Sequence, residues 1–597
     1  MLSRREVLSL LAAAPVALGA ETRKPNIVII LSDDQAWGDL SVTGNKNLST
    51  PNIDSLARDG AMFDRFFVCP VCSPTRAELL TGRYHPLGGV RGVSEGLERL
   101  NLDERTIADT FKANGYATGA FGKWHNGSQF PYHPNARGFD EYYGMTAGHW
   151  PNYFDTILDH NGEFVRGKGY LVDDLTDHAM AFIEKNKTKP FFCYLPVNSP
   201  HSPMQVPEKY FEKFSLMNPV MKNDKPEEED LGMTRAALAM CENIDWNVGR
   251  VLKKLDDLKL ANDTIVLYFS DNGPASARWN GGMRGRKGST DEGGIRSPLM
   301  MRWPGHIPGG TKVTQIAGAI DLLPTLADMA GVRLDSKKPL DGKVLTPLLT
   351  GKAPANWQDR MIFSTNNKKV SVRTQQYRLD DQGRLYDMVA DPSQTKDVSA
   401  AQPAVASKLK KAVADWSSEV FPFAGPDDRP FPVGYSKLTW LPARDGRAAG
   451  GVVRSNKYPN STFFTNWTSK EGEITWDVEV GKPGEFEVVI EYTCAAADVG
   501  STIEMSLLGK TAKAKVATAF DPPLQGATND RVVRIESYYK EFKPLSLGRV
   551  SLPKGRGKLT LRATEIAGKQ VADVFSVMLY RRTLLALAGG PAPEYAA

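Results

Sequence analysis

Cysteine is scarce in this sequence, which excludes a scaffold held together by disulfides. Only five of the 597 residues are cysteine, and an odd, sparse set cannot form a regular framework. No second CxxC accompanies the pair Cys69 and Cys72, which argues against a zinc site of that type. A redox role for the pair remains an alternative. At least one thiol therefore has a role other than pairing in a disulfide. The five cysteines are Cys69, Cys72, Cys193, Cys241 and Cys494.

A strong excess of one charge and long apolar runs are also missing. The formal net charge is +5, without a long Lys/Arg run, which argues against a nucleic-acid partner but is compatible with an anionic substrate. Beyond the first 20 residues, no apolar stretch reaches the ~18 residues of a membrane span. We therefore expect no membrane span in the mature chain.

The N-terminus has the pattern of an export signal. Ser3-Arg4-Arg5 precedes an apolar stretch from Val7 to Leu18, which ends in small residues at Gly19-Ala20. This pattern predicts a signal peptide over residues 1–20, and the arginine pair indicates the twin-arginine type. An amphipathic N-terminus is the alternative. The signal predicts export to the periplasm or the extracellular space.

Residues 24–420 predict an α/β domain with a large, mostly parallel sheet flanked by helices. Short β-branched runs alternate with helical patterns, and continuous runs are typical of strands buried on both faces. Four runs predict such strands: Asn26–Leu31, Ala117–Phe121, Phe191–Leu195 and Thr264–Phe269. Three of the intervening segments predict helices: Arg105–Asn114, Leu175–Lys185 and Thr234–Leu258.

The pattern changes twice towards the C-terminus. Residues 360–420 predict a small antiparallel subdomain followed by a helix, and residues 421–434, rich in Pro and Asp, predict a linker. Residues 435–585 predict a separate all-β sandwich, in which short strands alternate with turns. Its expected strands are Ile474–Val480, Phe486–Thr493, Thr502–Leu508, Val532–Ser537 and Lys558–Ala563. If this sandwich is independent, the preceding domain should fold and act without it.

Polar residues follow each of the four predicted parallel strands. In open α/β sheets, ligands bind beyond the carboxyl ends of the strands, so these residues should meet at one edge. The Asp and Asn residues among them could instead cap a helix or form an Asx turn, and the histidines could be structural. The residues concerned are Asp33 and Asp34, Lys123 and His125, His201, and Asp271 with Asn272.

Two of these strand ends predict a metal site. Asp33, Asp34, Asp271 and Asn272 offer only oxygen ligands, which suit Ca²⁺ or Mg²⁺ rather than zinc. Three carboxylates brought together would repel one another without a cation.

Cys72 lies where a helix is expected to begin. Ser73 and Pro74 are residues that favour the first turn, Ser73 as a cap. The amide groups and dipole at a helix N-terminus favour an anion. Arg76 follows Cys72 by four residues and therefore shares its side of the helix. This combination predicts a nucleophile in an oxyanion-binding site.

Other candidates lie in loops near these motifs. Lys287 belongs to a glycine-rich basic loop, for which an ordinary surface loop is the alternative. Polar and aromatic loop positions provide candidate substrate contacts: His149, Trp150, Arg278 and Trp279.

The run Cys72-Ser73-Pro74-Thr75-Arg76 through Leu80-Thr81-Gly82-Arg83 resembles the signature of the type I sulfatases of the alkaline phosphatase superfamily. The resemblance covers roughly Lys24 to Pro392. Its further motifs are Asp33-Asp34, Thr50-Pro51-Asn52-Ile53-Asp54, Gly122-Lys123-Trp124-His125, Asp271-Asn272-Gly273, Lys287 and Glu292-Gly293-Gly294-Ile295-Arg296.

The resemblance implies a sulfatase in which a formylglycine-generating enzyme oxidises Cys72 to formylglycine. One hydroxyl of the hydrated aldehyde would attack sulfur, and the other would later expel sulfate. It implies metal ligation by Asp33, Asp34, Asp271, Asn272 and residue 72. Arg76 would orient the diol, His125 would assist its breakdown, and Lys123, His201 and Lys287 would bind sulfate or the leaving oxygen.

The expected substrate is a sulfated carbohydrate or a similar sulfate ester. Two alternatives remain open. One is a hydrolase of phosphonate monoesters or phosphodiesters on the same scaffold. The other is a non-catalytic protein that binds sulfated glycans and in which Cys72 is never oxidised.

Overall fold

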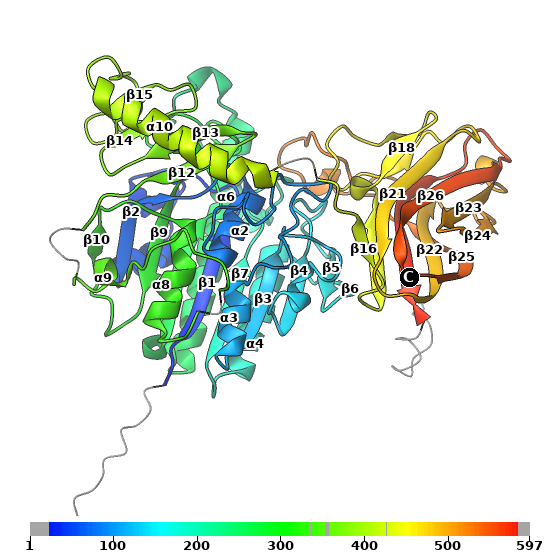
Figure 1. Ribbon diagram of the computed structural model, residues 1–597, viewed down its shortest axis with the longest axis horizontal. Coiled ribbons are helices and arrows are strands. Elements are labelled where there is room, and N and C mark those ends of the chain that lie inside the picture. Colours follow the sequence, from blue (N-terminus) through cyan, green and yellow to red (C-terminus); the bar gives the residue numbers. More distant parts are fainter. Residues whose placement is uncertain (1–22, 335, 353–356, 425–426, 583–597) are drawn as a thin grey trace, which may run out of the picture.

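The computed structural model describes residues 23–334, 336–352, 357–424 and 427–582. The predicted signal peptide, residues 1–20, lies outside the described residues. Within the described residues, none of the helices combines the length and the apolar character needed to cross a membrane. Figure 1 shows an α/β body with a small helix-covered sheet at one end and a β-sandwich beside it.

The α/β body is built on an eleven-stranded sheet whose centre is parallel, as predicted. β1 pairs in parallel with β7 and β8, and β3 pairs in parallel with β7 and β4. β9 pairs antiparallel with both β2 and β8. Across the sheet the order is β10 (Thr311–Val313), β2 (Ala61–Phe67), β9 (Arg296–Arg302), β8 (Thr264–Ser270), β1 (Asn26–Ser32), β7 (Phe191–Pro196), β3 (Ala117–Lys123), β4 (Glu141–Met145), β5 (Ile157–His160) and β6 (Glu163–Arg166), with β11 (Ala317–Gly318) paired to β2.

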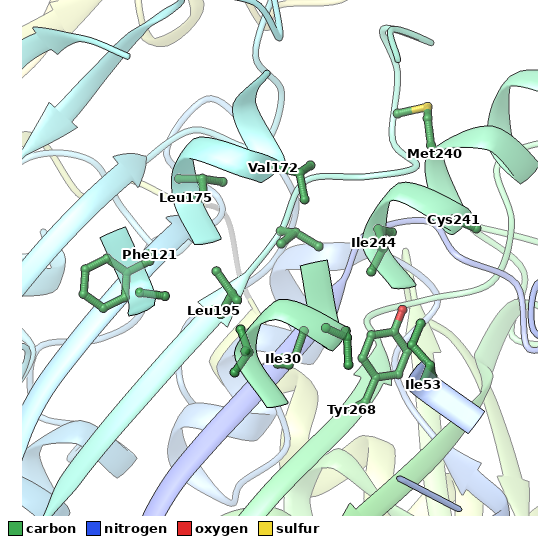
Figure 2. Close-up of a cluster of buried hydrophobic side chains, with 14 of the residues drawn as sticks. Ile30, Ile53, Phe121, Val172, Leu175, Leu195, Met240, Cys241, Ile244 and Tyr268 are labelled. Atoms are coloured by element: carbon green, nitrogen blue, oxygen red, sulfur yellow. The ribbon is translucent and has the colours of Figure 1, made fainter. Parts of the chain in front are cut away.

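Helices cover both faces of this sheet, which explains its continuous apolar strands. Ile30 packs with Leu195 and Tyr268 under one helical layer (Figure 2). Ile29 of the same strand packs on the opposite face. The first layer contains α1 (Pro51–Arg58), α4 (Leu171–Lys185), α5 (Glu208–Ser215) and α6 (Leu231–Asp257). The second contains α2 (Cys72–Thr81), α3 (Ile107–Ala113), α8 (Leu322–Met329) and α9 (Thr346–Leu349).

The predicted small subdomain is an antiparallel sheet of four strands. It consists of β12 (Ile362–Asn366), β13 (Lys369–Arg373), β14 (Tyr377–Leu379) and β15 (Leu385–Asp387). The helix α10 (Pro403–Val420) packs over it through Leu409 and Trp416 (Figure 1). Glu292, in the short helix α7 (Glu292–Ile295), is buried and forms an ion pair with Arg373 of β13. This pair fastens the small sheet to the loop that carries Lys287.

The C-terminal part is a β-sandwich of two six-stranded sheets. One contains β16 (Phe431–Val433), β18 (Arg447–Ala449), β21 (Glu473–Val480), β23 (Thr502–Leu507), β24 (Lys510–Lys515) and β26 (Gly555–Glu565). The other contains β17 (Leu438–Pro442), β19 (Val453–Arg454), β20 (Phe464–Thr465), β22 (Gly484–Thr493), β25 (Lys543–Leu552) and β27 (Asp573–Arg581). β16 falls inside the segment predicted as a linker, residues 421–434, and pairs with β21.

One predicted strand of the sandwich is absent from the described residues. Val532–Ser537 belongs to an irregular loop, residues 516–542, between β24 and β25. Its side chains still alternate, since Val533 and Ile535 are exposed and Arg534 is buried. The alternation arises because this segment packs on the α/β body instead of pairing with a strand.

Further contacts join the sandwich to the α/β body. Arg444 lies 3.5 Å from Glu98, and the Gln129 side chain donates to the Trp440 carbonyl. Phe164 of β6 packs edge-on against Trp440 of β17, where the two parts lie side by side in Figure 1. The sandwich therefore contacts the edge of the central sheet that is formed by β4, β5 and β6.

Candidate active site

The carboxyl ends of β1 and β8 bring four oxygen-bearing side chains together. Asp33 and Asp34 follow β1, while Asp271 and Asn272 follow β8, and all four are almost fully buried. Asp34 has a positive φ of 65°, a conformation that is costly for a non-glycine residue and common at functional sites. Its backbone amide donates to Asp271 Oδ1 at 3.2 Å, which locks the two strand ends together.

Two buried oxygens in this group have no hydrogen-bond partner. They are Asp33 Oδ1 and Asn272 Oδ1. Asn272 Nδ2 donates to Asp34 Oδ1 at 2.8 Å, which fixes the orientation of the amide. Burial and the neighbouring Asp33 carboxylate raise the pKa of Asp271 to about 7. Orphaned buried acceptors and crowded carboxylates are what a hard cation would satisfy, so this donor set fits Ca²⁺ or Mg²⁺.

Three cations pair with the three carboxylates. Lys123 Nζ donates to Asp33 Oδ2 at 2.6 Å, and Lys287 Nζ donates to Asp34 Oδ2 at 2.7 Å. Arg76 Nη2 donates to Asp271 Oδ2 at 2.7 Å. Burial opposes the charged form of Asp33, but its pKa is held well below the usual value, most strongly by Lys123. The site is therefore a buried cluster in which each carboxylate is paired with a cation.

Cys72 is the first residue of α2 and is buried beside the carboxylates. One ligand atom each from Asp33, Cys72 and Asp271 lies within 4.8 Å of the other two. The helix begins one residue earlier than the expected cap, because Val71 is the N-cap and Ser73 lies inside the first turn. The position of Cys72 at the helix N-terminus agrees with the sequence prediction.

Side-chain hydrogen bonds connect α2 to two strand ends. Thr75 Oγ1 donates to the Asp271 carbonyl at 2.6 Å, and Arg76 Nη1 donates to the Lys123 carbonyl at 2.8 Å. These bonds fix the start of the helix against β8 and β3. The same Thr75 oxygen accepts a hydrogen bond from the Cys69 amide. Cys69 therefore stabilises the turn that precedes the helix.

His125 is held in one orientation directly after β3. Its Nε2 lies 2.7 Å from the Val93 carbonyl, so Nε2 carries the proton and the buried Nδ1 is left without a partner. Burial and Lys123 hold the pKa of His125 well below its usual value. A Cβ on Gly148 would lie 2.1 Å from His125 Nε2, so a side chain at position 148 would displace the ring.

His201 and His149 lie together on another side of the site. His201 Nε2 is 3.8 Å from Asp34 Oδ2, and the two imidazole rings are 5.6 Å apart. His149 is only 4% exposed, yet neither of its ring nitrogens has a partner. Burial, together with His201, lowers the pKa of His149 to about 3.

The other three candidate substrate contacts each have a partner within the protein. Trp150 is half-buried and donates to Thr156 Oγ1 at 3.0 Å. Arg278 is buried in a bidentate pair with Asp39, and Trp279 stacks on Trp37. The guanidinium of Arg278 also donates to the Asp34 carbonyl, so it stabilises the backbone of one candidate metal ligand.

Sequence reasoning missed Glu536. This residue belongs to the loop 516–542 of the C-terminal sandwich, and its Oε1 accepts from Ser202 Oγ at 2.6 Å. Ser202 directly follows His201. No local motif marks Glu536, because its position depends on packing between parts of the chain that are more than 300 residues apart.

Comparison with known families covers the α/β body and the small subdomain. The family model described as Sulfatase matches residues 25–332. The model described as N-sulphoglucosamine sulphohydrolase, C-terminal, matches residues 287–419. Both matches end before the β-sandwich.

Individual relatives agree with these matches. Arylsulfatase A of Homo sapiens is 32% identical over 450 residues, covering 68% of this chain and 84% of that protein. N-acetylgalactosamine-6-sulfatase of Sus scrofa is 32% identical over 387 residues, covering 58% and 70%. The solved structure of Ps i-CgsB in complex with k-i-k-neocarrahexaose has a TM-score of 0.60 and 31% identity, covering 66% of this chain and 93% of that one. This chain belongs to the sulfatase family of the alkaline phosphatase superfamily and is an enzyme that hydrolyses sulfate esters.

Proposed function

We propose that this sulfatase removes sulfate from a sulfated carbohydrate, with the nucleophile derived from Cys72 and with one divalent metal ion. The observation that carries the proposal is the position of Cys72, at the start of α2 and within a cluster that also contains Asp33 and Asp271. The helix N-terminus and the nearby Arg76 favour an anionic group at this point.

Asp33, Asp34, Asp271, Asn272 and residue 72 would hold the metal ion. When bound, the ion would act as a Lewis acid that stabilises negative charge on the transferred group. The fit is supported by the two orphaned oxygens, Asp33 Oδ1 and Asn272 Oδ1.

The remaining groups bind charge and handle protons. Lys123 and Lys287 would contact sulfate oxygens, and Arg76 would orient the hydrated aldehyde formed by oxidation of Cys72. His125 offers an unprotonated Nδ1, which suits acceptance of a proton when sulfate is expelled. His201 would bind sulfate or the leaving oxygen through Nε2 when its ring is doubly protonated, since Nδ1 donates to the Ser202 carbonyl and Nε2 lies 3.8 Å from Asp34 Oδ2.

The carbohydrate class is supported by the names of relatives. One relative is an N-acetylgalactosamine-6-sulfatase, and the Ps i-CgsB structure contains a neocarrahexaose. Maturation by a formylglycine-generating enzyme and export through the N-terminal signal complete the proposal. We also propose domains over residues 24–420 and 435–585, with the second extended at its start to include β16. Mass spectrometry of the Cys72 peptide from the native producer tests oxidation, and an unmodified thiol would favour the non-catalytic alternative.

The metal is expected to be calcium or magnesium. Elemental analysis of the purified protein should find about one such ion per chain, because the donor set contains only oxygen apart from residue 72. Asp321→Asn is a matched control, since Asp321 pairs with Arg360 outside the cluster and should leave the metal content unchanged. Stoichiometric zinc without either ion would contradict this assignment.

Singly charged substrates are expected to react best. A phosphate monoester carries nearly two negative charges near neutral pH, whereas a sulfate ester carries one. Lys123, Lys287 and Arg76 are each already paired with a carboxylate, so little free positive charge remains for a second negative charge. We expect kcat/KM on an aryl sulfate to exceed that on the matched phosphate monoester by at least about tenfold.

The same comparison tests the phosphoesterase alternative. With matched leaving groups, phosphodiester and phosphonate monoester should be hydrolysed more slowly than the sulfate. Faster hydrolysis of the phosphodiester would favour a phosphoesterase while leaving the nucleophile and metal proposals intact.

A further inference from the structure

The loop 516–542 of the C-terminal sandwich is bound to the segment that follows β7. The Arg531 amide donates to the Met204 carbonyl at 2.9 Å, and Gln205 Nε2 donates to Asp530 Oδ1 at 2.8 Å. Gln205 and Asp530 also form an isolated antiparallel bridge. This segment also carries His201, so the sandwich fixes the backbone near a proposed catalytic group.

Arg534 connects the same loop to a second segment of the site. Its side chain is 1% exposed, and Nη1 donates to the Pro151 carbonyl at 2.6 Å. Its other nitrogens donate to the Asp530 carboxylate. Because Pro151 follows His149 and Trp150, Arg534 holds the loop between the segments carrying the two histidines.

Glu536 of the same loop is hydrogen-bonded to the residue that directly follows His201. It is half-buried, and one carboxylate oxygen accepts from Ser202 Oγ at 2.6 Å. Burial raises the pKa of Glu536, but His149 and the bond from Ser202 lower it overall, as expected for a carboxylate close to the imidazole. An acceptor therefore lies near His149, whose ring nitrogens have no partner and include a donor.

His149 as a donor and Glu536 as an acceptor would suit the hydroxyl groups of a sugar. The sugar ring would lie beyond His201 if sulfate occupies the Cys72 cluster, because His201 faces the leaving oxygen in the proposed function. A carboxylate there accepts hydrogen bonds from hydroxyl groups, and it repels a second sulfate or a uronate carboxylate.

We propose that the loop 516–542 forms one wall of the substrate site, and that Glu536 accepts a hydrogen bond from a hydroxyl of the sugar that loses sulfate. The inference rests on the proposed function and deepens it. Glu536 is thus a specificity-determining residue, and the preferred sugar carries no second anionic group on this side. The sandwich contributes directly to substrate selection.

The test compares the full-length enzyme with Glu536→Gln on two probes. One probe is whichever monosulfated sugar the wild type hydrolyses best from a panel that includes N-acetylgalactosamine 6-sulfate. The other is 4-nitrophenyl sulfate, which has no sugar hydroxyls. The ratio of kcat/KM on sugar to kcat/KM on aryl sulfate should fall about 10-fold, mainly through KM, because glutamine still accepts a hydrogen bond but lacks the charge that strengthens it.

Three comparisons make the result specific. Glu541→Gln, the same chemical change on the same loop, should leave the ratio at the wild-type value. Glu536→Asp keeps the charge but shortens its reach, so it should lower the ratio less, and it provides a second variant if the glutamine variant folds poorly. Relative activity on disulfated sugars should rise in Glu536→Gln, because the repelling charge is gone.

Equal loss on both probes would overturn the inference, since it would mean that Glu536 only supports the fold of the site. An unchanged ratio in Glu536→Gln would overturn it as well. Both outcomes would leave the sulfatase proposal standing. A wild-type enzyme that hydrolyses aryl sulfate but no sulfated sugar would instead refute the carbohydrate proposal and this inference with it.

Discussion

Replacing Cys72 by alanine is expected to lower kcat on an aryl sulfate by at least about 10⁴-fold, because the proposed nucleophile is lost while the binding groups stay. Cys72 is the first residue of α2 and lies in the cluster with Asp33 and Asp271. Steady-state kinetics with 4-nitrophenyl sulfate, together with metal analysis of the variant, measures the effect.

Cys69→Ala is the matched control, because Cys69 is equally buried and only three residues away. Its backbone amide, which donates to Thr75 Oγ1, is retained in alanine. The variant should keep most of its activity, with some loss of thermal stability from the smaller side chain. Equal loss in the two variants would instead favour a redox-active CxxC, in which both thiols are needed.

Asp271→Asn is expected to have the second largest effect, at least about 10³-fold on kcat/KM together with loss of the bound metal ion. The substitution keeps the shape of the side chain but removes a carboxylate from the cluster. It also leaves Arg76 buried without its 2.7 Å partner, and breaking a buried pair in this way costs about 3–5 kcal/mol. Elemental analysis and thermal melting measure the two consequences separately.

Asp321→Asn is a control that separates loss of stability from loss of the metal ion. Asp321 forms a buried pair with Arg360 at 2.7 Å, remote from the proposed metal ligands. This variant should lose stability to a similar degree and keep its metal ion and most of its activity. Retention of stoichiometric metal in Asp271→Asn would exclude Asp271 as a necessary ligand.

The central sheet could be predicted because its strands have an unmistakable pattern. After a polar first residue, runs such as Asn26–Leu31 and Thr264–Phe269 are apolar or aromatic at every position, which is expected where helices cover both faces. Once these strands are parallel neighbours, their carboxyl ends must lie together, and the meeting of Asp33 with Asp271 follows. The core of the site could therefore be placed from sequence.

The rest depended on contacts that no local pattern records. Val532–Ser537 has the alternation of a strand, but it packs on the α/β body and has no strand partner. Arg278 lies close to the motifs along the chain, yet its guanidinium is buried in an ion pair with Asp39. Glu536 was missed for the same reason, since its place is set by the docking of the sandwich.

The positions of the strands along the chain determine when Cys72 becomes enclosed during protein synthesis. Cys72 is 3% exposed in the finished fold, and β8, which brings Asp271 beside it, is made about 200 residues later. At translation rates of about 5–20 residues per second, roughly 10 to 40 seconds pass between the two. During that interval the nascent chain presents Cys72 without β8 to enclose it, so an oxidising enzyme that works on the emerging polypeptide meets an accessible thiol.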